Sequence, residues 1–167
     1  MPTKEQIEQI IKALQKILRI QDWDISFKYV PEAEARDLYG ENCSGGNLRY
    51  RDRAESQIII NADNSRIKNI PDYWYHTLVH EIYHIVTDDF IYIIDDIMPH
   101  VRDEYVRKEL NETKNIKYEH LVNRLAQGFV NAYPVSNFDH ILKPVKPCTT
   151  AEMVEMVSGM TPIMKGV

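Results

Sequence analysis

The sequence predicts an α+β fold in which a helix and a small, largely antiparallel sheet precede a pair of helices. Two patterns indicate this arrangement. Between residues 23 and 61, apolar residues alternate with polar ones in short segments, which is the period of β-strands. Before and after these segments, apolar residues recur every three or four positions, which is the period of an amphipathic helix. Strands that are grouped apart from helices are typical of α+β domains.

The length and charge of the chain narrow its class. A chain of 167 residues can bury a core and is short enough to form one domain, which we place at residues 1–133, followed by a proline-containing extension at 134–167. The net charge of −5 and the pI of about 5.7 argue against nucleic-acid binding. The two cysteines, Cys43 and Cys148, imply no disulfide framework, and we find no signal peptide and no membrane-spanning run. We therefore expect a cytoplasmic protein.

The first helix is predicted from Thr3 to about Arg19. Thr3 and Gln6 have the spacing of a weak capping box. The apolar residues that follow at helical spacing are Ile7, Ile10, Ile11, Leu14, Ile17 and Leu18. We expect this helix to pack on the sheet of its own domain rather than to bind a partner.

Three segments are predicted to form strands. The first alternates at Trp23, Ile25, Phe27 and Tyr29 and ends at Pro31. Residues 47–51 and 57–61 are predicted to form a hairpin, whose second strand is apolar on both faces and therefore more internal. The run Arg49-Tyr50-Arg51-Asp52-Arg53 could bind nucleic acid or an acidic substrate, but we favour a solvated hairpin rim.

The next predicted helix follows Pro71-Asp72 and carries His80-Glu81-Ile82-Tyr83-His84. Two histidines four residues apart lie on one face of a helix, close enough to share one metal ion. The glutamate after the first histidine does not ligate and can hold a water as general base. Nitrogen ligands with an open position most simply indicate Zn²⁺. The surrounding residues are apolar, so the helix is expected to be buried.

A catalytic zinc site needs a third protein ligand. The downstream candidates are Asp88, Asp89, His100, Glu104, Glu112, Glu119 and His120. Asp88 would need a chain reversal after His84, and no glycine is present there to make one. Glu119 is the better candidate because it begins a segment with helical spacing of apolar residues. Asn123 lies one turn further on and could orient a ligating histidine by a hydrogen bond.

These residues resemble those of the gluzincin type of zinc metallopeptidase, in which a helix with His80, Glu81 and His84 precedes a helix bearing a Glu ligand such as Glu119. The closer likeness is to very small metallopeptidases encoded by bacteriophages and prophages, and it covers residues 4 to 133. The resemblance implies a minimal zincin-like fold, and a location in the host cytoplasm or the virion. In gluzincins an Asp often stands one turn after the ligating Glu. Here Asn123 occupies that position and supplies no negative charge.

The remaining segments are predicted from composition. Asp88 to His100 should follow the helix of His80 and His84 by an irregular path. Residues 101–112 should form a charged helix above the cleft at the predicted zinc site. Residues 114–133 should form the Glu119 helix, ended by Pro134. In the extension, Thr149 and Glu152 predict a short helix with a methionine stripe of Met153, Met156, Met160 and Met164. We expect this stripe to pack on the same domain, although such stripes also form promiscuous binding surfaces.

The function that these features predict is zinc-dependent hydrolysis of peptide bonds in a peptide or protein substrate. Zinc held by His80, His84 and Glu119 would activate a water, and Glu81 would accept its proton. Candidates for the oxyanion-stabilising donor, by residue type only, are His76, His100, Tyr105 and Tyr118. One alternative is a non-enzymatic protein-binding module of phage type that is stabilised by zinc, and another is a zinc hydrolase acting on a different bond.

Overall fold

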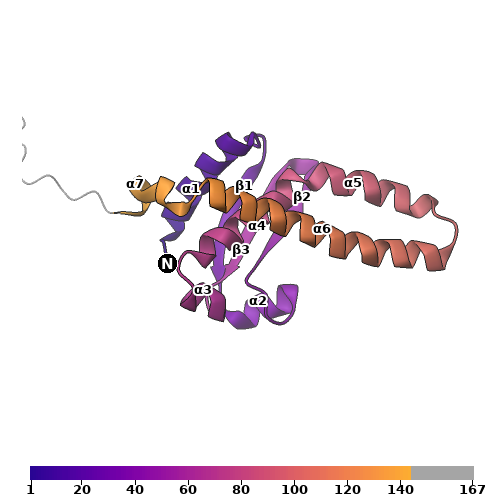
Figure 1. The fold of residues 1–167 in the computed structure, drawn as a ribbon, viewed down its shortest axis with the longest axis horizontal. Helices are drawn as coiled ribbons and strands as arrows, with labels where there is room; N and C mark the ends of the chain where they lie inside the picture. The colour runs from indigo at the N-terminus through magenta and orange to yellow at the C-terminus, as the bar shows by residue number, and fades with distance from the viewer. Residues whose placement is uncertain (144–167) are drawn as a thin grey trace, which may run out of the picture.

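A three-stranded sheet lies at the centre of the fold, with helices on both of its faces (Figure 1). A computed structural model describes residues 1–143, to which every structural statement below refers. The α-helices are α1 (Lys4–Leu18), α2 (Glu32–Tyr39), α3 (Ser65–Asn69), α4 (Tyr73–Val86), α5 (Asp88–Ile97), α6 (Glu104–Ala132) and α7 (Asp139–Leu142). The strands are β1 (Asp24–Val30), β2 (Gly45–Tyr50) and β3 (Glu55–Asn61). The α+β class is therefore as predicted.

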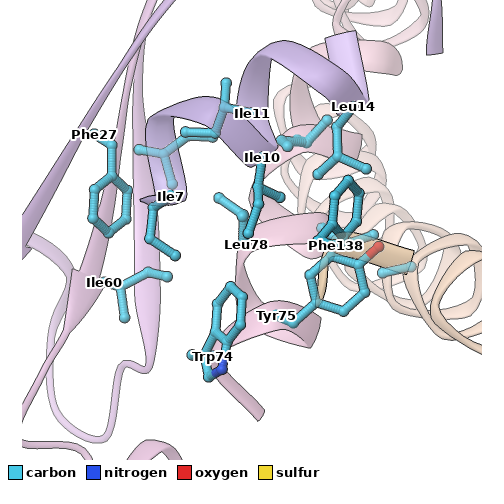
Figure 2. Close-up of a cluster of buried hydrophobic side chains, with 14 of the residues drawn as sticks. Ile7, Ile10, Ile11, Leu14, Phe27, Ile60, Trp74, Tyr75, Leu78 and Phe138 are labelled. Carbon is cyan, nitrogen blue, oxygen red and sulfur yellow. The ribbon is translucent and has the colours of Figure 1, made fainter. Parts of the chain in front are cut away.

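Helix α1 begins with the predicted capping box. The Thr3 side chain accepts a hydrogen bond from the Gln6 backbone, and the Gln6 side chain accepts one from the Thr3 backbone, which satisfies two N–H groups. The buried face of α1 consists of Ile7, Ile10, Ile11 and Leu14. These side chains pack against Phe27 and Ile60 of the sheet and Leu78 of α4, as predicted for a helix that covers its own sheet (Figure 2).

The strand order is β1-β3-β2, so β3 lies in the middle of the sheet. Its residues Ile58, Ile59 and Ile60 are all buried, which confirms that the second hairpin strand is internal. β2 runs antiparallel to β3, but β1 runs parallel to it, so the sheet is mixed and the prediction of a largely antiparallel sheet is wrong. The segment between β1 and β3 is long enough for a crossover, and within it α2 covers the second face through Ala35.

The second half of the chain differs from the prediction between α4 and Glu119. Residues 88–97 are helical rather than irregular, and a single 29-residue helix, α6, replaces the two helices predicted at 101–112 and 114–133. The side chain of Asp103 caps α6 by accepting a hydrogen bond from the Val106 backbone, 3.0 Å away. The first half of α6 does not contact the core. Its apolar residues therefore do not recur at helical spacing, which is why the sequence did not predict one continuous helix.

We define the arm as α5, the short turn Met98–His100 and α6 as far as Lys117. The arm projects beyond the sheet and α1, whereas the second half of α6 packs along α4 (Figure 1).

The extension after residue 133 begins on the same domain. Phe138 is buried against Tyr75 of α4, and the Gln6 amide donates hydrogen bonds to the carbonyl oxygens of Ile141 and Leu142. The predicted short helix and the methionine stripe lie outside the described residues. Within residues 1–143, no helix combines the length and the apolar character needed to cross a membrane.

Candidate metal centre

Helix α4 places the two histidines one turn apart, as predicted. Its opposite face is anchored in the core by Leu78 and Ile82, which fixes the rotation of the helix. His80 and His84 consequently point to the same side, and their Nε2 atoms lie 3.1 Å apart. At this distance the two nitrogens can both bond a single metal ion.

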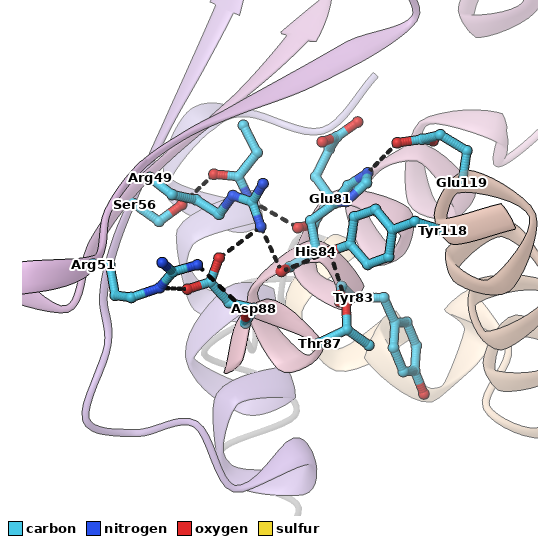
Figure 3. A network of polar contacts seen from close by, with 11 residues as sticks. Arg49, Arg51, Ser56, Glu81, Tyr83, His84, Thr87, Asp88, Tyr118 and Glu119 are labelled. Carbon is cyan, nitrogen blue, oxygen red and sulfur yellow. Dashed lines mark hydrogen bonds and ion pairs between the residues drawn. The ribbon is translucent and has the colours of Figure 1, made fainter. Parts of the chain in front are cut away.

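Helix α6 brings Glu119 to this pair. One carboxylate oxygen lies 3.6 Å from His80 Nε2, and the other lies 3.5 Å from His84 Nε2. Figure 3 shows Glu119 reaching from α6 toward the His84 ring. The donor atoms of the three side chains lie within 4.8 Å of one another, so they could hold one metal ion.

The surroundings of the histidines favour their neutral, metal-binding form. Burial lowers the pKa of both rings. Together with the neighbouring His80 and Arg49, burial lowers the pKa of His84 to about 3. Asn123 lies beside His80 and partly opposes the effect of burial on that ring. His84 Nδ1 is buried without a hydrogen-bond partner in the described chain, at a cost of about 1–3 kcal/mol.

Glu81 lies beside the three donors without belonging to their cluster. Its side chain is buried, and this burial, reinforced by the negative charge of Glu119, raises the pKa of Glu81 to about 8. Gly45 of β2 lies close to the same helix, since a Cβ atom there would lie 2.6 Å from the Thr77 methyl group. The Glu81 carboxyl group is therefore a proton acceptor or donor near neutral pH, as expected of a general base.

Strand β2 contributes residues that were not predicted to belong to the site. Asn47 donates a hydrogen bond to the Glu81 backbone carbonyl at 2.8 Å, and Arg49 donates one to the His84 carbonyl at 2.8 Å. Arg49 also pairs with Asp88 at 2.8 Å, and Arg51 pairs with the other oxygen of the same carboxylate (Figure 3). These contacts fasten the edge of the sheet to the helix that carries both histidines.

The hairpin-rim interpretation of residues 49–53 is therefore wrong for Arg49 and Arg51 and correct for Arg53, whose side chain is 72% exposed. The signal that could have shown this is the alternation of Asn47, Arg49 and Arg51 on one face of a strand. Asp88, only 3% exposed, binds these arginines and is not part of the donor cluster. Its rejection as the third ligand thus agrees with the structure.

A cavity of about 320 Å³ leads to the donor cluster. Its lining includes Tyr39, Cys43, Gly46, Asn47, Arg49, His80, Glu81, His84 and Glu119. The Tyr39 hydroxyl is buried without a partner among the described residues, and burial raises its pKa to about 12. Tyr39 therefore forms part of the cavity wall as a neutral side chain.

None of the four residues considered as oxyanion donors lines this cavity. The Tyr118 hydroxyl lies 2.9 Å from Thr87 Oγ1 and packs beside the His84 ring. His76 is stacked on Tyr73, and His100 and Tyr105 belong to the arm. The cationic group that does face the cavity is Arg49, which sequence reasoning assigned elsewhere.

Comparison of the chain with known protein families, with curated proteins and with solved structures finds no match in any of the three.

Proposed function

We propose that this protein is a gluzincin-like zinc metallopeptidase with a zincin-like fold, of the small type encoded by phages and prophages, that hydrolyses peptide bonds. The observation that carries the proposal is the combination of three converging donors, His80, His84 and Glu119, with a buried glutamate, Glu81, that stands beside them and outside their cluster. A site with three protein ligands and an approach from solvent is typical of catalytic rather than structural zinc.

The donor set suits zinc in particular. Two imidazole nitrogens and one carboxylate oxygen form a common set in catalytic zinc sites, whereas Ca²⁺ and Mg²⁺ prefer oxygen ligands. When bound, zinc would supply a lowered pKa for water and a polarised substrate carbonyl. His80 and His84 would hold it through Nε2, and Glu119 would hold it through its carboxylate.

Glu81 would carry the proton. In this proposal its carboxylate accepts a proton from the attacking water and later returns it to the leaving amine, so that one group serves as base and then as acid. The Asn47 amide holds the Glu81 backbone in place through its 2.8 Å hydrogen bond. Glu81 therefore has a fixed position from which proton transfer needs no rearrangement of the helix.

Arg49 would stabilise negative charge in the cavity. Its guanidinium is fixed by Asp88 and by the His84 carbonyl. Burial raises the pKa values of Glu81 and Glu119, and the positive charge of Arg49 partly opposes that rise. A fixed cation close to a reacting carbonyl favours the oxyanion that develops there. Arg49 would therefore be the oxyanion-stabilising donor, a role for which the sequence gave only candidates by residue type.

Strand β2 offers a place for the substrate backbone. Within the described residues β2 pairs with β3 alone, so its second edge is free for strand addition next to the cavity. Main-chain hydrogen bonds to this edge would hold an extended peptide whatever its side chains are. The substrate class supported by this geometry is therefore a peptide or an unfolded segment of a protein.

The competing function is a zinc-stabilised binding module without activity. A structural zinc site is closed by a fourth protein ligand. In the part of the chain that the structure describes, the cluster contains three residues, and the cavity reaches it from the β2 side. This arrangement favours the enzyme.

The experiment that separates the two functions is the substitution Glu81→Gln, which keeps the size of the side chain and removes its basic oxygen. We expect wild-type zinc content and a loss of hydrolysis of about 10²–10⁴-fold. Glu112→Gln, on the exposed part of α6, is the matched control and should leave both quantities unchanged. Zinc is measured by metal analysis, and hydrolysis is measured with a broad peptide library.

A narrow specificity could hide activity in such a library, so the Glu81→Gln protein should also serve as bait for partner proteins. Cleavage of a captured partner by the wild type, but not by Glu81→Gln, supports the peptidase. Equal cleavage by both proteins would remove Glu81 from its role. A zinc-loaded wild type that binds partners and cleaves none of them would instead identify a binding module.

A further inference from the structure

The arm exposes an unusual amount of apolar surface. Its exposed large apolar side chains are Phe90, Tyr92, Ile93, Ile97, Tyr105, Val106, Leu110 and Ile116. At roughly 50–100 Å² each, they offer on the order of 400–800 Å². They do not form a single patch, because the Tyr92 ring lies under the Arg51 guanidinium, whereas Phe90, Ile97 and Leu110 line a common groove.

Part of this surface forms a groove between the two helices of the arm. The groove measures about 600 Å³ and is lined by Phe90, Ile94 and Ile97 of α5 and by Leu110, Tyr118 and Leu121 of α6. We call it the arm groove. It is distinct from the cavity at the donor cluster, with which it shares no lining residue. The inference that follows does not depend on the proposed activity.

One face of α5 carries an apolar stripe, two of whose residues, Phe90 and Ile97, also line the arm groove of their own copy. Phe90, Ile93 and Ile97 lie on one stripe at spacings of three and four residues, and they are 55%, 59% and 58% exposed. Such a stripe is how an amphipathic helix presents its anchors to a hydrophobic groove. The arm thus carries both a groove and a helix of the kind that fits it.

The charged residues of α5 and those of the arm groove have opposite signs. All four charged residues of α5 are acidic, namely Asp88, Asp89, Asp95 and Asp96. The wall of the groove formed by α6 contains Lys114 and Lys117. Lys114 pairs with Asp95 of its own chain, while Lys117 makes no ion pair within residues 1–143. Asp88 is held by Arg49 and Arg51, and Asp95 is held by Lys114, so Asp89 and Asp96 of another copy are the acidic groups that could pair with Lys117.

We propose that two copies of this chain associate through their arms, with α5 of each copy seated in the arm groove of the other. The contact is isologous, because each copy supplies the same helix and the same groove, and it closes after two subunits. The exposed apolar side chains that this contact would cover are Phe90, Ile93, Ile97 and Leu110. The four arm helices then form one bundle with the apolar stripes at its centre.

The test is the oligomeric state of the full chain, measured by sedimentation velocity over a wide concentration range. We expect a dimer that dissociates on dilution. Phe90→Glu and Ile97→Glu each place a charge in the proposed contact and should shift the dissociation constant by at least tenfold or abolish the dimer. Ile17→Glu, at a 42% exposed position on α1 away from the arm, is the matched control and should leave the dimer intact.

A wild type that stays monomeric at every concentration overturns the proposal, and so does a dimer that survives both arm substitutions. If the wild type is monomeric and becomes dimeric when Met156 and Met160 are replaced by Glu, the groove is occupied by the C-terminal segment of the same chain. Hydrogen exchange of the wild type guards against misfolded variants. The amides of α5 must become more protected as the concentration rises, and protection independent of concentration contradicts the dimer.

Discussion

Removal of the Asp88 side chain should destabilise the fold strongly, although this residue binds no metal in the proposed site. Its carboxylate is 3% exposed and accepts hydrogen bonds from Arg49 and Arg51, one guanidinium on each oxygen. Arg49 belongs to β2 and Arg51 follows its last residue, whereas Asp88 begins α5 shortly after α4. The substitution Asp88→Ala therefore leaves two cations facing each other without a counter-charge.

The structure indicates the size of the effect. Breaking a buried ion pair by removing one partner costs about 3–5 kcal/mol. The side chains of Arg49 and Arg51 are 27% and 36% exposed, so water can partly solvate them, and we expect the lower end of the range, about 3 kcal/mol. For a protein of this size, that loss corresponds to a fall in Tm of roughly 6–12 °C.

The assay is urea denaturation of the metal-free protein, with Asp89→Ala as the matched control. Asp89 is the exposed neighbour of Asp88, and its removal should change the free energy of unfolding by less than about 0.5 kcal/mol. Zinc stoichiometry should stay at one ion per chain in both variants. A loss below about 1 kcal/mol in Asp88→Ala would refute the buried network, and a loss of zinc binding altogether would make Asp88 a ligand.

Three further predictions concern the metal and the buried acid. Glu119→Ala should weaken zinc affinity at least tenfold in a chelator-competition assay, whereas Glu112→Ala on the exposed part of the same helix should not; equal affinities would exclude Glu119 as a ligand. Chelation of zinc should lower Tm by mass action but leave a cooperative transition, because α1 and the sheet share a core without the metal; an apo protein that melts without a transition would indicate structural zinc. Folding raises the pKa of Glu81 from 4.5 to about 8, so between these values the folded state holds a proton that the unfolded state has lost. The metal-free protein should therefore lose about 2 kcal/mol of stability between pH 6.5 and 8, and Glu81→Gln should remove this loss. Below pH 6.5 the lowered pKa of His84 changes stability with pH in the opposite direction.

Periodicity accounts for the parts of the fold that sequence reasoning predicted correctly. Apolar residues recur at helical spacing in α1 and on the buried side of α4, because one face of each helix packs on the same core. The three isoleucines from Ile58 to Ile60 predicted an internal strand because both of their faces are covered. At the candidate site, the spacing of His80 and His84 determines their separation, since one helical turn leaves little freedom.

The parts that could not be predicted depend on contacts between distant segments. A period of two does not show the direction of a strand, so the parallel pairing of β1 with β3 left no trace in the sequence. Arg49 and Asp88 are 39 residues apart, so the alternation of charged residues on one strand could not identify Asp88 as their partner. In the first half of α6, apolar residues do not cover the core of their own chain, and a core-facing period is absent. In α5 the helical spacing of Phe90, Ile93 and Ile97 was present, and the prediction of an irregular path missed it.

Strand β2 and helix α4 match each other in spacing, which explains how an edge strand comes to lie beside the donor cluster. Alternate residues of β2 face the helix. A Cβ atom at Gly45 would lie 2.6 Å from the Thr77 methyl group, Asn47 donates to the Glu81 carbonyl, and Arg49 donates to the His84 carbonyl. Two residues of a strand advance by about 6.7 Å, whereas the contacted helix residues Thr77, Glu81 and His84 advance by about 6.0 Å and then about 4.5 Å. The strand therefore follows the helix over about two turns, and within the described residues this leaves the second edge of β2 beside the cavity at the donor cluster.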